Sequence, residues 1–130
     1  MMGGELSDAV RLFVSQHIDA AEQLDILLLL QREPERSWTA LQVSQAIYTV
    51  PASATMRLEE LVTKGFLASS GSSDPAYTYR PSSDELQDRV TELASAYARD
   101  RVTVIKLIFS KPPDAVESFS DAFRLRGKRD

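Results

Sequence analysis

Four carboxylates early in the last third of the chain are the first candidates for acid–base chemistry. Asp84, Glu85, Asp88 and Glu92 recur at the intervals of a helix, and Arg89 lies among them. Carboxylates that alternate with arginines at helical spacing are typical of a solvated helix face. We therefore expect these groups to lie on a helix surface and not in an active site.

The chain also lacks the groups that metal or nucleophilic chemistry requires. His17 is the only histidine and cysteine is absent, so the usual nitrogen and sulfur ligands of a metal site are missing. The serines have no histidine in a recognisable triad arrangement. No GxxxxGKS/T or GxGxxG loop is present to hold phosphates. We predict a protein that is not an enzyme, with no catalytic residue, cofactor or metal.

Length and composition predict one domain, 1–130. The chain has 130 residues, 43% of them apolar, which is enough for a single core. The absence of cysteine fits a reducing compartment, and the N-terminus shows no signal-peptide pattern. The longest apolar run, 26–30, is far short of the ~20 residues that a membrane span needs. We expect a cytoplasmic protein without membrane contact.

The formal net charge of −4 is unevenly distributed. Residues 1–36 hold three arginines against seven carboxylates, whereas residues 37–81 hold three basic and three acidic side chains and are neutral. The tail is locally basic through Arg124, Arg126, Lys128 and Arg129. Dedicated nucleic-acid binders tend to carry a basic face, so the distribution excludes a strongly electrostatic mode of nucleic-acid binding.

A helix, a tight turn and a second helix are expected between residues 39 and 64. Ser37 or Thr39 can cap the first helix, 39–48. Pro51 suits the first turn of the second helix, 52–64, because its missing N–H costs nothing there. Gly65 then stands where a residue of positive φ commonly ends a helix.

A small β-hairpin is expected at 66–80. Two short β-prone runs flank the loop sequence SSGSSDP, whose serine, glycine and proline content indicates a turn. A helix, a turn, a helix and a hairpin in that order, here over residues 37–81, form a winged helix-turn-helix, which lays its second helix in the DNA major groove. The expected fold class is mainly α with a small β-hairpin, extended by N- and C-terminal helices.

Two helices are predicted in the N-terminal segment 1–36, at 5–18 and 20–32. Asp19 followed by Glu22 predicts a capping box for the second of them, and Pro34 requires it to stop by the preceding residue. Its run 26–30 is apolar on every face, so we expect this helix to be central and surrounded.

One long helix is predicted at 83–109, within the segment 82–111, and Ser82 or Ser83 can cap it. Its near-heptad apolar positions are Leu86, Val90, Leu93, Tyr97, Val104 and Ile108. A helix of this length spans about 40 Å, more than the winged unit needs, so we predict a homodimer through the terminal helices. The tail, 112–130, adds a short amphipathic helix at 114–124.

The segment LQVSQAIYTVPASATMRLEELVTKGFL resembles the winged helix-turn-helix regulators of bacteria, including the MarR-like group. Their shared pattern has a small residue in the first helix, then a turn, two spaced leucines, a glycine and a hydrophobic pair. The positions in this chain are Ala46, Leu58, Leu61, Gly65, Phe66 and Leu67.

The resemblance implies a bacterial DNA-binding transcription regulator that acts as a homodimer on double-stranded DNA, with the second helix in the major groove. Arg57 would make the strongest contact, and Ser53 and Thr55 would bond base edges or phosphates. The DNA-binding residues that the resemblance implies are Ala52, Ser53, Thr55, Met56, Arg57 and Arg80.

A second function stays open: a winged-helix protein–protein interaction module that does not bind DNA. The hairpin loop, 69–75, has Asp74 and lacks the arginine or lysine that usually probes the minor groove. Glu59 and Glu60 place two carboxylates on the second helix, where phosphate repels them. These features count against DNA contact, while the helix order keeps DNA binding as the first expectation and the interaction module as the alternative.

Overall fold

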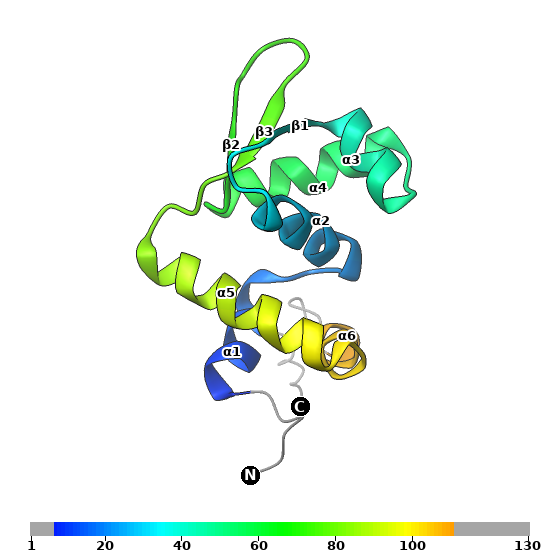
Figure 1. Ribbon diagram of the computed structural model, residues 1–130. Helices are drawn as coiled ribbons and strands as arrows, with labels where there is room; N and C mark the ends of the chain where they lie inside the picture. Colours follow the sequence, from blue (N-terminus) through cyan, green and yellow to red (C-terminus); the bar gives the residue numbers. More distant parts are fainter. Residues whose placement is uncertain (1–6, 111–130) are drawn as a thin grey trace, which may run out of the picture.

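The computed structural model describes residues 7–110, which form six helices and a three-stranded sheet (Figure 1). The elements are α1 (Asp8–His17), α2 (Ala21–Arg32), β1 (Ser37–Thr39), α3 (Ala40–Ile47), α4 (Pro51–Thr63), β2 (Leu67–Ser69), β3 (Ala76–Tyr79), α5 (Asp84–Arg99) and α6 (Arg101–Ser110). The mainly α fold class with one hairpin is confirmed. No helix among the described residues is long and apolar enough to cross a membrane.

Local capping chemistry sets the ends of α3 and α4. Thr39 and Gln42 form a capping box at the start of α3, which satisfies two backbone donors that would otherwise lack partners. Tyr48 ends α3 in the left-handed conformation, with φ of 61°. Pro51 is the first residue of α4, as predicted, and Gly65 follows α4 with φ of 91°.

The sheet has the strand order β1-β3-β2, with both pairs antiparallel. The short strand β1 pairs with β3 and places Trp38 opposite Tyr77. Trp38, Tyr77 and Tyr79 share the buried face of the sheet, while Ser37 and Thr78 bond each other on the exposed face. The predicted hairpin at 66–80 is therefore present, and its aromatic side chains pack against the core.

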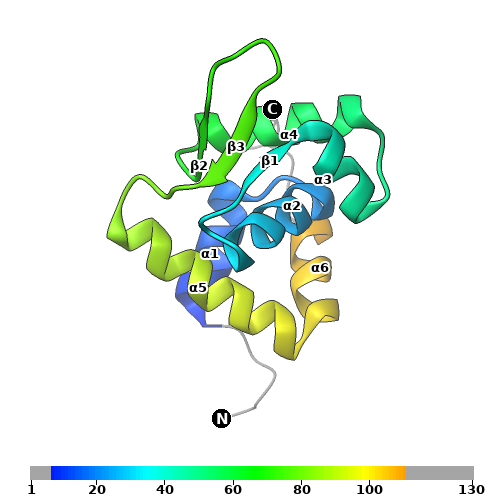
Figure 2. The same cartoon turned by 45° about the horizontal axis from the view of Figure 1, so that its top comes forward.

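The second helix, α2, is central, as its apolar run predicted. Figures 1 and 2 show it between α4 and the layer that holds α1, α5 and α6. It packs against α3, α4 and β3, and its buried side chains include Leu24, Ile26, Leu27 and Leu30. The start of α2 differs from the expectation, because Ala20 is the N-cap and no side chain caps the helix. The predicted Asp19–Glu22 capping box is wrong.

The predicted continuous helix at 83–109 is also wrong. Ser83 caps α5 as expected, but Asp100 (φ −152°) separates α5 from α6. Its carboxylate accepts hydrogen bonds from the Thr103 N–H at 3.2 Å and from the Thr103 hydroxyl at 2.5 Å. An aspartate that satisfies the first turn of a following helix competes with helix continuation, so the chain turns there.

The turn at Asp100 folds the last apolar positions back onto the same chain. Val104 and Ile108 are buried within the described residues, where α6 contacts α1 and α5. They do not continue an exposed heptad stripe. The predicted tail helix at 114–124 and the basic residues of the tail lie outside the described residues, as do the first two positions of the predicted helix 5–18.

Candidate nucleic-acid interface

The second helix of the helix-turn-helix, α4, has three differently occupied faces. The inward face buries Ala54, Leu58 and Leu61 completely. A flanking stripe of partly exposed residues, Ser53, Arg57 and Glu60, lies towards α2. The exposed side chains follow the spacing of one helix face. This surface, called here the outward stripe, consists of Ala52, Thr55, Met56, Glu59 and Thr63.

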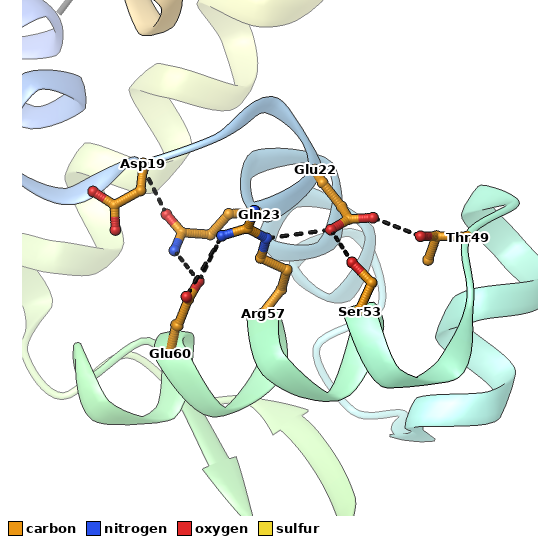
Figure 3. Close-up of polar contacts among 7 residues, drawn as sticks. All are labelled: Asp19, Glu22, Gln23, Thr49, Ser53, Arg57 and Glu60. Carbon is orange, nitrogen blue, oxygen red and sulfur yellow. Dashed lines mark hydrogen bonds and ion pairs between the residues drawn. The ribbon is translucent and has the colours of Figure 1, made fainter.

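The Glu22 carboxylate of α2 joins the turn and α4 (Figure 3). One oxygen accepts a hydrogen bond from the Thr49 hydroxyl at 2.6 Å, and the other accepts from the Ser53 hydroxyl at 2.6 Å. Arg57 Nε donates to that second oxygen at 3.2 Å. Because Glu22 lies beside the first turn of α4, its negative charge also interacts favourably with the helix dipole.

Arg57 and Gln23 continue this arrangement to Glu60. Arg57 Nη1 lies 3.1 Å from Glu60 Oε1, and the same oxygen accepts from Gln23 Nε2 at 2.9 Å. Gln23 is fully buried, and its amide oxygen accepts the Asp19 N–H at 2.9 Å. The set Glu22, Gln23, Thr49, Ser53, Arg57 and Glu60 is called here the α2–α4 polar cluster.

Two groups of the cluster, Glu22 and Arg57, are stabilised in their charged forms. Hydrogen bonds from Ser53 and then Thr49 hold the pKa of Glu22 below its usual value, with Arg57 adding to the effect against partial burial. Burial opposes the charge of Arg57, but hydrogen bonds and ion pairs with Glu60 and Glu22 outweigh it and raise the pKa of the guanidinium. One cation faces two carboxylates, so the cluster carries an excess of negative charge.

Glu59, the charged residue of the outward stripe, also has a hydrogen-bond partner. The Tyr77 hydroxyl on β3 donates to the Glu59 carboxylate, which links the hairpin to α4. Burial, reinforced by the negative Glu59, raises the pKa of Tyr77 to about 12, so this hydroxyl keeps its proton under physiological conditions. Together with the polar cluster, this bond positions α4 from both sides.

The turn between the two helices presents apolar side chains to solvent. Tyr48 is 94% exposed and Val50 is 62% exposed. Leu41 and Ala46 on α3 are exposed as well. The buried positions of α3 are Val43 and Ser44.

The structure divides the six implied DNA-binding residues into three groups. Ala52, Thr55 and Met56 lie together on the outward stripe. Ser53 and Arg57 come together through Glu22, and the Arg57 side chain is only 21% exposed. Arg80 is exposed, but it follows β3 at the base of the hairpin. It lies beside a hollow lined in part by Gln31 and Asp84, at the opposite end of the strand from the loop.

Sequence reasoning missed the two residues on which the cluster depends. Glu22 was expected to cap its own helix, and Gln23 had no predicted role. The partners of Glu22 lie 27, 31 and 35 positions away, so local spacing carried no signal for them. Within the described residues, no group of three or more histidine, cysteine or acidic side chains could hold a metal ion.

Comparisons with known proteins identify the fold. No family model and no curated protein sequence matches the chain. Several solved structures match it over most of their length, and three of them are described here. The adhesin competence repressor AdcR of Streptococcus pyogenes is 16% identical, with a TM-score of 0.51 over 85% of this chain and 78% of that chain.

The transcriptional regulator Tm0710 of Thermotoga maritima is 15% identical, with a TM-score of 0.51 over 93% of this chain and 88% of that chain. A MarR family protein of Bacillus stearothermophilus is 16% identical, with a TM-score of 0.50 over 89% and 78%. These likenesses show that the chain has a MarR-like winged helix-turn-helix fold.

Proposed function

We propose that this protein is a DNA-binding transcriptional regulator that acts as a homodimer, with α4 of each copy in the major groove. The observation that carries the proposal is that α4 is held by polar contacts on two sides and exposed on the third. The polar cluster and the Tyr77–Glu59 bond hold the helix in place, while its outward stripe is left uncovered. A helix fixed on two sides and bare on the third suits insertion into a groove.

In this proposal Ala52, Thr55 and Met56 meet the base edges, because they occupy the first two turns of the exposed face. Ser53 and Arg57 act chiefly by holding α4 against α2. Direct contact between Arg57 and DNA would exchange its two carboxylate partners for a phosphate or a base. Arg80 would reach a phosphate from the base of the hairpin. None of these roles requires catalysis, a metal or a cofactor.

The proposed dimer uses the end of the molecule opposite the hairpin. α1, α5 and α6 lie there together (Figure 1), and this layer exposes Leu12, Val102 and Phe109. Apolar side chains gathered at one end are typical of an interface, and two-fold symmetry would present two α4 helices to two half-sites. Light scattering at micromolar concentration tests the dimer, and a monomer mass would reject it.

Duplex binding is tested by titration against random DNA at two salt concentrations. A matched pair of variants identifies the face: Met56→Glu on the outward stripe and Ala98→Glu on an exposed position of α5. Both add one negative charge to a helix surface. We expect Met56→Glu to weaken binding at least tenfold, because phosphates repel the added charge, and Ala98→Glu to leave it within about twofold.

One observation favours the protein-interaction module as a second function. The turn exposes Tyr48 and Val50, and the left-handed conformation of Tyr48 costs a bulky residue about 1 kcal/mol. An exposed aromatic side chain held in a strained conformation is a feature of contact surfaces. If the wild type binds no duplex even at low salt, this module becomes the proposed function.

A further inference from the structure

We infer that this protein recognises its half-site mainly through the 5-methyl groups of thymine, which Ala52, Thr55 and Met56 contact. The inference rests on the proposed function and concerns how the same surface distinguishes one DNA sequence from another. It follows from what the outward stripe contains, and from which donors are already engaged elsewhere in the chain.

The outward stripe lacks the side chains that make two-point contacts to bases. Guanine is recognised most often by arginine or lysine, and adenine by asparagine or glutamine. None of these residue types occurs among Ala52, Thr55, Met56, Glu59 and Thr63. The arginine of this helix, Arg57, faces Glu22 and Glu60 instead.

Glu59 does not replace the missing donors. A glutamate can accept a hydrogen bond from the cytosine amino group, but this carboxylate already accepts one from the Tyr77 hydroxyl. The bond fixes this carboxylate at the hairpin side of the stripe, and turning the whole group towards a base would leave the buried Tyr77 hydroxyl without its partner. Hydrogen-bonded base recognition by the charged residues of α4 is therefore disfavoured on both sides of the stripe.

Apart from the threonine hydroxyls, the groups that remain are methyl and thioether groups in a compact patch. Positions 52, 55 and 56 are related by three and four residues, so their Cβ atoms are neighbours about 5–6 Å apart. Neighbouring bases on one strand are about 3.4 Å apart along the axis, so the patch spans two or three base pairs. Met56 is 48% exposed, and its flexible thioether adapts to irregular apolar surfaces.

Thymine is the base that offers a matching partner in the major groove. Its 5-methyl group projects there, and alanine and the threonine methyl are known to contact it. The absence of cations from the stripe also fits, because methyl contacts need no charge. We expect preferred half-sites with two or three thymines at adjacent positions, distributed over either strand.

The test begins with selection of preferred duplexes from a random pool. Each thymine of the selected half-site is then replaced by deoxyuracil, which deletes the methyl group and keeps base pairing. Loss of a buried methyl weakens binding about fourfold, so we expect this change at two or three positions. Deoxyuracil outside the half-site is the matched control and should have no effect.

A protein variant separates direct contact from altered DNA shape. Thr55→Ser removes the side-chain methyl and keeps the hydroxyl. On unmodified DNA it should weaken binding a few-fold, and on the duplex with deoxyuracil at the contacted position it should cost nothing further. Additive losses would mean that the methyl acts through DNA shape and would overturn the inference.

The outcomes distinguish this inference from the function on which it rests. Specific duplex binding that is insensitive to every deoxyuracil replacement overturns methyl recognition and leaves the proposed function intact. Absence of duplex binding at low salt rejects both. A third outcome would also overturn the inference: guanine-rich sites are selected, and Arg57→Ala both weakens binding to them and alters the base preference. That result would assign base recognition to the arginine.

Discussion

The face of α4 towards α2 and its outward stripe differ in a way that residue types alone do not reveal. The face towards α2 carries Ser53, Arg57 and Glu60, all of which bond to groups of α2 or to one another. The outward stripe carries no cation and only one carboxylate, which is bonded to the hairpin. The side chains best suited to bind DNA are thus used to hold the helix, and the exposed face is nearly uncharged.

The largest expected effect separates the buried face of α4 from the outward stripe. Leu58→Ala empties part of the core and should lower the free energy of unfolding by about 2–5 kcal/mol. Met56→Ala removes a half-exposed side chain and should change it by less than about 0.5 kcal/mol. Chemical denaturation of both variants measures the difference, and equal losses would mean that α4 is rotated from the described position.

A smaller loss is expected when the polar cluster loses its central acceptor. Glu22→Ala leaves Thr49, Ser53 and one donor of Arg57 without their partner. Because the Glu22 side chain is 27% exposed, water replaces part of the loss, and we expect about 1–2 kcal/mol. Glu33→Ala, which removes the exposed partner of Arg36, is the control and should cost about 0–0.5 kcal/mol.

The pH dependence of the Glu22 contribution has a definite sign. The folded state lowers the pKa of this carboxyl below its ordinary value of 4.5, so the unfolded chain binds the proton more readily. The stabilisation is therefore complete above about pH 5.5 and is lost as the pH falls through 4.5 and below. The stability difference between wild type and Glu22→Gln should shrink on acidification, and growth of that difference would contradict the assigned bonds.

Two tyrosines of β3 allow a finer comparison of the link between the hairpin and α4. Tyr77→Phe removes the bond to Glu59 and should cost about 1 kcal/mol. Tyr79→Phe removes a buried hydroxyl that has no hydrogen-bond partner among the described residues, so it should be neutral or slightly stabilising. Thermal unfolding of the pair measures this difference, and the reverse order would mean that Glu59 does not anchor the hairpin.

Local chemistry explains which parts of the fold could be predicted from the sequence. Thr39, Pro51 and Gly65 each act within a few residues of their own position, so the start of α3 and both ends of α4 followed from residue type. The break at Asp100 was not predicted because the apolar spacing continues across it. An aspartate three residues before Thr103 was the available signal for a new helix start.

The candidate site was predictable only in part, because its polar bonds are not local. The buried stripe of α4 follows from the spacing of Ala54, Leu58 and Leu61. The residues beside this stripe bond to polar groups of α2, and Glu22 is the main one. The sequence pattern predicted a capping box for Glu22 instead. Arg57 consequently appeared to be a free cation in the sequence, whereas the fold gives it two carboxylate partners.

The measurement that tests the division of α4 most directly is the salt dependence of duplex binding by wild type and Arg57→Ala. A lost phosphate contact would make the slope of log K against log salt shallower by about 0.9. Arg89→Ala, which also frees a carboxylate from an ion pair, is the matched control. If Arg57 holds α4 in place, binding weakens uniformly and the slope matches that of the control. A slope shallower by about 0.9 for Arg57→Ala alone would show that the arginine contacts DNA and would contradict its structural role.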